Sequence, residues 1–150
     1  MRVLGVHLLK GEFRFGVLEG TRQQPVLVVS RRVVTLSHDY APSLMDWYDS
    51  QFRQLLASYA PERIAYRLTL DPKKEQLITS EFPYGILNLL AHQNNIPINY
   101  YTAQNYTASR LSLPKGTDLH SYCDSVLGQH PPYWDANQRN AILAAWFELQ

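Results

Sequence analysis

Residues 2–19 read RVLGVHLLKGEFRFGVLE, and this stretch decides the fold because it predicts two paired strands. Residues 2–9 are a short apolar run rich in strand formers, followed by a tight turn at Lys10-Gly11-Glu12. Residues 12–19 carry an apolar residue at every second position, which is typical of a half-buried strand. Residues 26–36 are heavily β-branched and predict a third strand. Three consecutive strands with short connections predict an antiparallel meander.

Helices and two further strands follow this meander. Ser43-x-x-Asp46 is typical of a helix cap, so we expect a helix that begins at Ser43 and ends at Tyr59-Ala60-Pro61. Later elements are expected as a strand at 63–70, a helical segment interrupted near Pro83, a strand at 97–103, short helices at 104–112 and 117–127, and a helix at 134–149 with an apolar stripe of Ala141, Ile142, Ala145, Trp146 and Leu149. This order predicts one α/β domain over residues 1–150. Its mixed five-stranded sheet joins the meander to two parallel strands and has helices on both faces.

The composition excludes several classes of protein. The chain has 150 residues, of which 45% are hydrophobic and 18% charged, and its net charge is +1. A disordered tail, a collagen-like chain and a strongly basic nucleic-acid sleeve are therefore excluded. The single cysteine, Cys123, excludes an intramolecular disulfide framework and is typical of a reducing compartment. No apolar run reaches membrane-spanning length and no cleavage-site pattern follows Met1, so we expect a cytoplasmic protein with no membrane partner.

Charge is uneven along the chain. Residues 1–75 hold 11 basic and 8 acidic side chains, whereas residues 76–150 hold 3 basic and 5 acidic ones. One interpretation is a solvated basic face on the N-terminal half. The other is a modest phosphate-contacting surface for nucleic acid, made by Arg14, Arg22, Arg31 and Arg32.

Three short segments together carry a resemblance: Val3-Leu4-Gly5-Val6-His7, Glu62–Arg67 and Asp135–Ala141. They resemble the first strand, the fourth strand and the start of the final helix of the ribonuclease H-like superfamily, in particular of its RuvC resolvase branch. The layout is also similar to a small uncharacterised bacterial family of resolvase-like domains of unknown function. The resemblance implies a site in which carboxylates hold two Mg²⁺ or Mn²⁺ ions for phosphodiester cleavage.

The site residues depart from that pattern. The first-strand carboxylate position holds His7, the fourth-strand position holds Arg67, and the second acidic position of the last helix holds Asn140, which leaves Asp135 alone. The resemblance therefore implies the fold and argues against the activity. Strand alternation places Gly5 and His7 on one face of the first strand, and Ala65, Arg67 and Thr69 on one face of the strand at 63–70. The resemblance implies that these two strands are neighbours, so we predict an Arg67–Asp135 ion pair with His7 beside it. This pair either satisfies buried polarity or belongs to a ligand site derived from the vestigial centre.

Other candidate sites have weaker patterns. His120-x-x-Cys123-Asp124 with His130 offers zinc ligands at a spacing of no standard finger, and Cys123 also suits an ordinary buried thiol. His38-Asp39 suits either an acid–base pair or a loop cap. No nucleophile elbow and no glycine-rich nucleotide loop is present.

Tyrosines gather in the C-terminal third, at Tyr100, Tyr101, Tyr106, Tyr122 and Tyr133. They suit core packing, a homodimer surface, or stacking on single-stranded nucleic acid.

Our leading hypothesis is a non-catalytic domain with a nucleic-acid-associated or protein-interaction role and no cofactor. One alternative is a metal-dependent, structure-selective nuclease with a rearranged site that uses Asp135 and His7 with Mg²⁺ or Mn²⁺. The other alternative is a structural homodimer.

Overall fold

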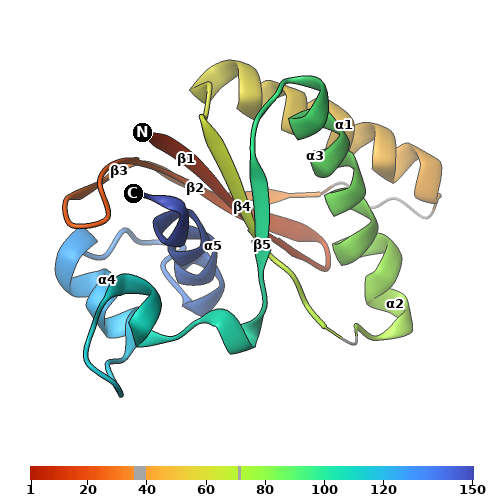
Figure 1. Ribbon diagram of the computed structural model, residues 1–150. Coiled ribbons are helices and arrows are strands. Elements are labelled where there is room, and N and C mark those ends of the chain that lie inside the picture. The colour runs from red at the N-terminus through yellow and green to blue at the C-terminus, as the bar shows by residue number, and fades with distance from the viewer. Residues whose placement is uncertain (36–39, 71) are drawn as a thin grey trace.

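The computed structural model describes residues 1–35, 40–70 and 72–150 and contains a single mixed sheet of five strands. The strands lie in the order β3-β2-β1-β4-β5, and Figure 1 shows them crossing the centre of the molecule. Their bounds are Arg2–Leu9 for β1, Glu12–Gly20 for β2, Pro25–Val34 for β3, Arg63–Arg67 for β4 and Ile98–Tyr101 for β5. The first three strands pair antiparallel, and β4 and β5 run parallel to β1. The expected meander with two parallel strands is confirmed.

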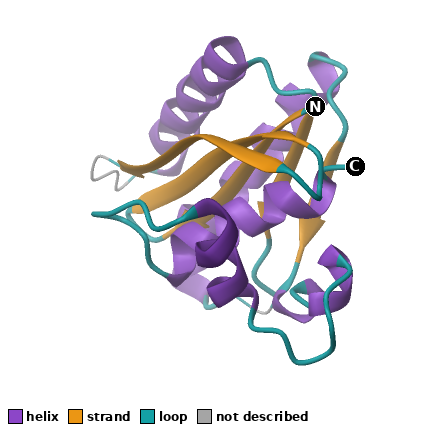
Figure 2. Cartoon of the chain, turned by 90° about the vertical axis from the view of Figure 1, so that its left-hand side faces the viewer, coloured by secondary structure: helices purple, strands orange, loops and turns teal. Residues whose placement is uncertain are grey.

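Helices cover both faces of the sheet, as expected (Figures 1 and 2). One face carries α1 (Ala41–Tyr59) and α3 (Phe82–Gln93), and the other carries α5 (Ala136–Glu148) with α4 (Leu119–Leu127) beside it. The connections contain a short α2 (Lys74–Gln76), a π-helical turn η1 (Leu77–Glu81), and the 3₁₀ turns η2 (Ala103–Asn105) and η3 (Ala108–Leu111). The sheet therefore has one core on each side.

Several predicted boundaries move. β4 ends at Arg67 rather than at residue 70, and β5 is shorter than the predicted 97–103. Helix α1 begins at Ala41, so the prediction that Ser43 caps it is wrong: the cap residue is Tyr40, and the Ser43 hydroxyl donates to the Tyr40 carbonyl. A proline in the first turn has no N–H to satisfy, which lets the helix begin earlier. His38-Asp39 lies outside the described residues.

Helix α5 is buried on nearly all sides, so its predicted apolar stripe is too narrow. Besides the five stripe residues, Leu143, Ala144 and Phe147 are also buried. The sheet covers one side of the helix, while α4 and η3 cover the other. A helix enclosed in this way loses the periodicity that marks a surface helix.

Two glycines let α5 lie close against the sheet. Gly5 of β1 pairs with Gly16 of β2. A Cβ on Gly5 would lie 2.0 Å from the carbonyl oxygen of Ala141, and a Cβ on Gly16 would lie 2.7 Å from Cγ1 of Ile142. Because no side chain intervenes, the second turn of α5 rests directly on the middle of β1 and β2. This packing brings the start of the helix beside His7 and Arg14, where the candidate site lies.

Candidate functional site

Three basic residues form a row across neighbouring strands. Two of them lie two residues from Gly5 and Gly16, the glycines against which α5 packs. His7 pairs with Arg14 across β1 and β2, and Arg67 ends β4 on the other side of β1. Since side chains two residues apart along a strand share a face, these three point toward the start of α5. The expected juxtaposition of His7 and Arg67 follows from this register.

Asp135 pairs with Arg14, so the predicted Arg67–Asp135 ion pair is wrong. Arg14 Nη1 donates to Oδ1 of Asp135 at 2.7 Å and Nη2 donates to Oδ2 at 3.0 Å. The same Oδ1 accepts from the N–H of Gln138 at 3.0 Å and caps α5. The start of α5 therefore presents its carboxylate to β2 rather than to β4. Both carboxylate oxygens are engaged, and His7 lies beside this pair.

Glu12 extends the Arg14 pair into a network. Its Oε1 accepts from Nη2 of Arg14 at 3.0 Å, and its Oε2 pairs with Arg32. The Arg32 guanidinium in turn lies 4.9 Å from the ring centroid of Tyr133. Two arginines and two carboxylates thus balance one another. Arg14 is buried, so the expectation that it contacts phosphate is not supported.

His7 is only 6% exposed, and its Nδ1 lies 3.4 Å from the carbonyl oxygen of Asn137. Burial lowers its pKa to about 4, and the charges of Arg67 and Arg14 act in the same direction. The contact with Asn137 and the Asp135 charge oppose this shift only in part. The imidazole is therefore neutral at physiological pH.

Arg67 has no carboxylate partner within the residues that the structure describes. Its guanidinium lies 4.3 Å from the ring centroid of Tyr106, whose hydroxyl donates to the carbonyl oxygen of Asn140 at 2.6 Å. Arg67 lines two hollows. One is a pocket of about 310 Å³ shared with Ala103, Tyr106, Thr117, Asp118, Leu119, His120 and Asn140. The other, of about 200 Å³, is shared with Leu68, Thr69, Leu70, Thr102, Ala103 and Gln104. The row thus ends in a cation beside open space.

His120 joins this site, which the sequence reasoning missed in that role. Its Nε2 lies 2.8 Å from Oδ1 of Asn140, and because an amide oxygen can only accept, Nε2 carries the proton. The other zinc candidates point elsewhere: Cys123 is fully buried, Asp124 pairs with Arg139, and His130 contacts the Leu127 carbonyl. The buried-thiol interpretation of Cys123 is confirmed. In the described part of the chain, no three His, Cys, Asp or Glu residues converge as metal ligands.

The site does not fit a pair of divalent cations. Such ions need several convergent oxygen ligands, and here the strand positions hold an imidazole and a guanidinium. Both carboxylate oxygens of Asp135 accept from Arg14, and one of them also caps α5. The side-chain oxygen of Asn140 accepts from His120. The donor set therefore suits an anion better than a metal.

The remaining predicted nucleic-acid contacts are dispersed. Arg22 donates to the carbonyls of Phe147 and Leu149 and so anchors the end of the chain. Arg32 is paired with Glu12. Arg31 is exposed and has no ion-pair partner among the described residues, but it shares a face of β3 with Val29 and Val33, which pack against the core under α1 and α3, so it lies on the face of the sheet opposite to the site. These arginines do not form one surface.

Most of the clustered tyrosines pack within the protein. Tyr101 is buried, and the rings of Tyr106 and Tyr122 contact Phe147 and Trp146 respectively. Tyr100 and Tyr133 are exposed. The core-packing interpretation therefore holds for three of the five.

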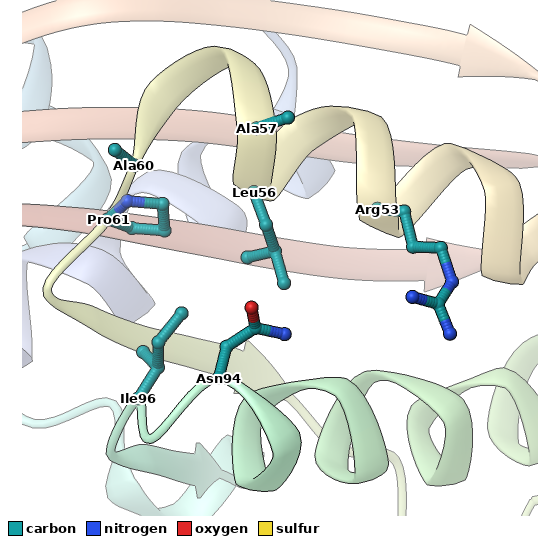
Figure 3. A pocket seen from close by; sticks show the side chains of 7 residues that line it. All are labelled: Arg53, Leu56, Ala57, Ala60, Pro61, Asn94 and Ile96. Atoms are coloured by element: carbon teal, nitrogen blue, oxygen red, sulfur yellow. The ribbon is translucent and has the colours of Figure 1, made fainter.

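Another hollow, of about 410 Å³, lies between the C-terminal ends of α1 and α3, at the opposite end of the sheet (Figure 3). Arg53 at its rim pairs with Asp49, and Nδ2 of Asn94 donates to the Leu90 carbonyl. Its polar groups are thus engaged within their own helices, and none of the predicted site residues lies there.

No helix in the described ranges is long and apolar enough to cross a membrane.

Comparison with known proteins identifies the fold. No protein-family model and no curated protein matches the chain. Among solved structures, RuvC of T. thermophilus in complex with a Holliday junction substrate has a TM-score of 0.78 at 15% identity, over 98% of this chain and 92% of that chain. The yeast mitochondrial Holliday junction resolvase Ydc2 has a TM-score of 0.63 at 12% identity, over 97% and 76%. The fowlpox virus resolvase has a TM-score of 0.57 at 7% identity, over 98% and 94%. The chain has the expected ribonuclease H-like fold in its RuvC-like form.

Proposed function

We propose that this RuvC-like domain binds nucleic acid, branched DNA foremost, and does not cleave it by metal-dependent chemistry. The observation that carries the proposal is the sign of the charge at the ends of β1 and β4. There His7 is held neutral and Arg67 supplies a cation, where metal-dependent phosphodiester cleavage needs carboxylates.

Electrostatics supports the loss of cleavage. A divalent ion 4 Å from the Arg67 guanidinium would be repelled by about 8 kcal/mol at an effective dielectric of ~20. Any oxygen that Asp135 offered to the ion would first have to leave Arg14, which is only 5% exposed. A buried arginine stripped of its partner is itself costly. The nuclease alternative with Asp135 and His7 therefore has no supporting contact in the described residues.

Nucleic acid is favoured as the partner for two reasons. The T. thermophilus RuvC structure, with the same fold over nearly the whole chain, contains a Holliday junction. The cation that replaces the carboxylate in this chain keeps an attraction for phosphate without requiring a metal. A protein-interaction role has no comparable contact to support it.

The test is binding in the absence of metal. Fluorescence anisotropy of labelled four-way junction, duplex and single-stranded DNA in EDTA should show binding that weakens steadily as salt rises. The same DNAs incubated with Mg²⁺ or Mn²⁺ should stay intact. Absence of binding at low salt would remove nucleic acid as the partner. Cleavage that Asp135→Asn abolishes would overturn the non-catalytic part.

A further inference from the structure

The Arg67 guanidinium uses few of its hydrogen-bond donors within the described residues. A guanidinium has five N–H donors in its plane, and stacking over a ring uses the face of that plane. The guanidinium of Arg67 contacts the ring and the hydroxyl of Tyr106 within the described residues, and the hydroxyl takes one donor. Because Arg67 also lines two hollows, its remaining donors are available there to phosphate oxygens.

We infer that Arg67, Asn140 and His120 form a metal-independent pocket for one phosphodiester group of the nucleic acid, an inference that rests on the proposed function. The Tyr106 ring packs against the Arg67 guanidinium, and the Tyr106 hydroxyl donates to the backbone carbonyl of Asn140. Arg67 and Asn140 are therefore positioned before any ligand arrives. Such preorganisation reduces the entropy that binding must overcome.

Asn140 adds a second donor. Its Oδ1 accepts from Nε2 of His120, which fixes the orientation of the amide, and no partner of Nδ2 is found within the described ranges. Because Asn140 and Arg67 line the same pocket of about 310 Å³, an anion there meets a charged fork and an amide N–H₂. This volume is at the lower end of the usual range of about 300–1,000 Å³ for small-ligand sites, which suits a single phosphate better than a whole nucleotide.

Asp118 is the acidic residue that lines this pocket. Its Oδ1 accepts from the backbone N–H of His120 at 2.9 Å and of Ser121 at 3.3 Å, so the carboxylate is held at the start of α4 as a helix cap. The positive end of the helix offsets its charge. We therefore expect the phosphate to bind between Arg67 and Asn140 rather than at the backbone N–H groups that Asp118 caps.

The surroundings also favour an internal phosphodiester over a stacked base. Arg67 lies over the Tyr106 ring, and Phe147 packs against that ring in a T-shaped contact at a ring-centroid separation of 5.0 Å, so a base would have to compete with these contacts to stack there. Arg67 lines two hollows, one shared with Asn140 and the other with Leu68 and Leu70. A nucleic-acid strand that binds by one phosphate thus has a second hollow beside Arg67 into which it can continue.

Dimethyl phosphate is a suitable probe, since it is a phosphodiester with no base or sugar. Titrated into the ¹⁵N-labelled protein in EDTA, it should shift the side-chain amide signals of Asn140 and the backbone signals of His120 in a saturable way. Arg67→Met keeps the apolar stem over Tyr106 and removes the charge, so the saturable shifts should disappear. Arg31→Met removes an exposed arginine from the opposite face and should leave them unchanged.

Junction binding gives the second readout. Arg67→Met should weaken four-way junction binding in EDTA about 10- to 100-fold, as expected for a charged hydrogen-bonding group, and should lower the salt slope by about one. Arg67→Lys, which keeps the charge without the planar fork, should fall between the two. A thermal melt of each variant shows that it is folded.

The outcomes separate the two proposals. Wild-type junction affinity in folded Arg67→Met, or dimethyl phosphate shifts that survive the substitution, would overturn the pocket and leave the proposed function standing. Equal effects of Arg31→Met and Arg67→Met would reduce the pocket to general electrostatics and overturn it. Saturable dimethyl phosphate binding without DNA binding would support the pocket and refute the proposed function.

Discussion

Replacing Asp135 with asparagine tests whether this carboxylate is a structural partner or a remnant metal ligand. Asparagine caps a helix about as well as aspartate, so the change removes mainly the ion pair with Arg14. Arg14 is buried, whereas the Asp135 side chain is 52% exposed and Glu12 remains as a second partner. The loss therefore falls between that of a surface pair and that of a buried one, at about 1–2 kcal/mol. Asp135→Ala also loses the cap and should cost about 1 kcal/mol more.

Thermal unfolding followed by circular dichroism measures both variants. In a chain of this size 1 kcal/mol corresponds to about 2–4 °C in Tm, so we expect decreases of about 4 °C for Asn and about 8 °C for Ala. Asp118→Asn is the matched control. Asp118 also caps a helix but has no arginine partner within the described residues, so its Tm should hardly change.

The pH dependence gives an independent check. Burial opposes ionisation of Asp135, but hydrogen bonds from Arg14 and the Gln138 N–H outweigh it and hold the pKa below its ordinary value of 3.8. The stability that the ionised form contributes is complete above 3.8 and is lost as the pH falls through the lowered pKa. The Tm difference between wild type and Asp135→Asn should therefore close in strong acid. A variant as stable as wild type at pH 7, or a gap that is independent of pH, would refute the structural role.

Three further changes test other parts of the structure. Gly5→Ala places a methyl group 2.0 Å from the Ala141 carbonyl oxygen and must displace α5, so urea unfolding should show a loss of at least about 3 kcal/mol. A milder effect would mean that α5 lies further from the sheet. For His7, whose pKa falls to about 4, the neutral form favours the folded state, and stability should decline by about 3 kcal/mol as the pH falls from 6.5 to 4. His7→Gln should lack this decline. A variant whose stability depends on pH in the same way as that of the wild type would contradict the assignment to His7. Burial raises the pKa of Glu81 to about 7, and its Oε2 has no hydrogen-bond partner among the described residues. Glu81→Gln should raise Tm at pH 8 but not at pH 4, and an equal gain at both would refute the assignment.

Much of the fold could be predicted because its signals are local. The period-two alternation of residues 12–19 and the turn at Gly11 require no knowledge of distant contacts, and the observed β2 begins at the predicted residue. Element boundaries are not local where tertiary contacts decide them. The strand predicted at 63–70 ends at Arg67, because β5, its neighbour in the sheet, is itself only four residues long.

The candidate site could also be predicted only in part, because some of its contacts are local to a strand and others join distant elements. The sequence by itself determined, through alternation, which face of its strand each of His7 and Arg67 occupies. Its resemblance to the RuvC-like fold predicted that they stand at carboxylate positions and that their strands are neighbours. Alternation assigns a side chain to a face but does not say over which strand a helix begins. Only the tertiary structure decided that Asp135 lies over β2 and pairs with Arg14. The contact between His120 and Asn140 was decided there too, because it joins residues of different helices whose packing leaves no periodic trace in the chain.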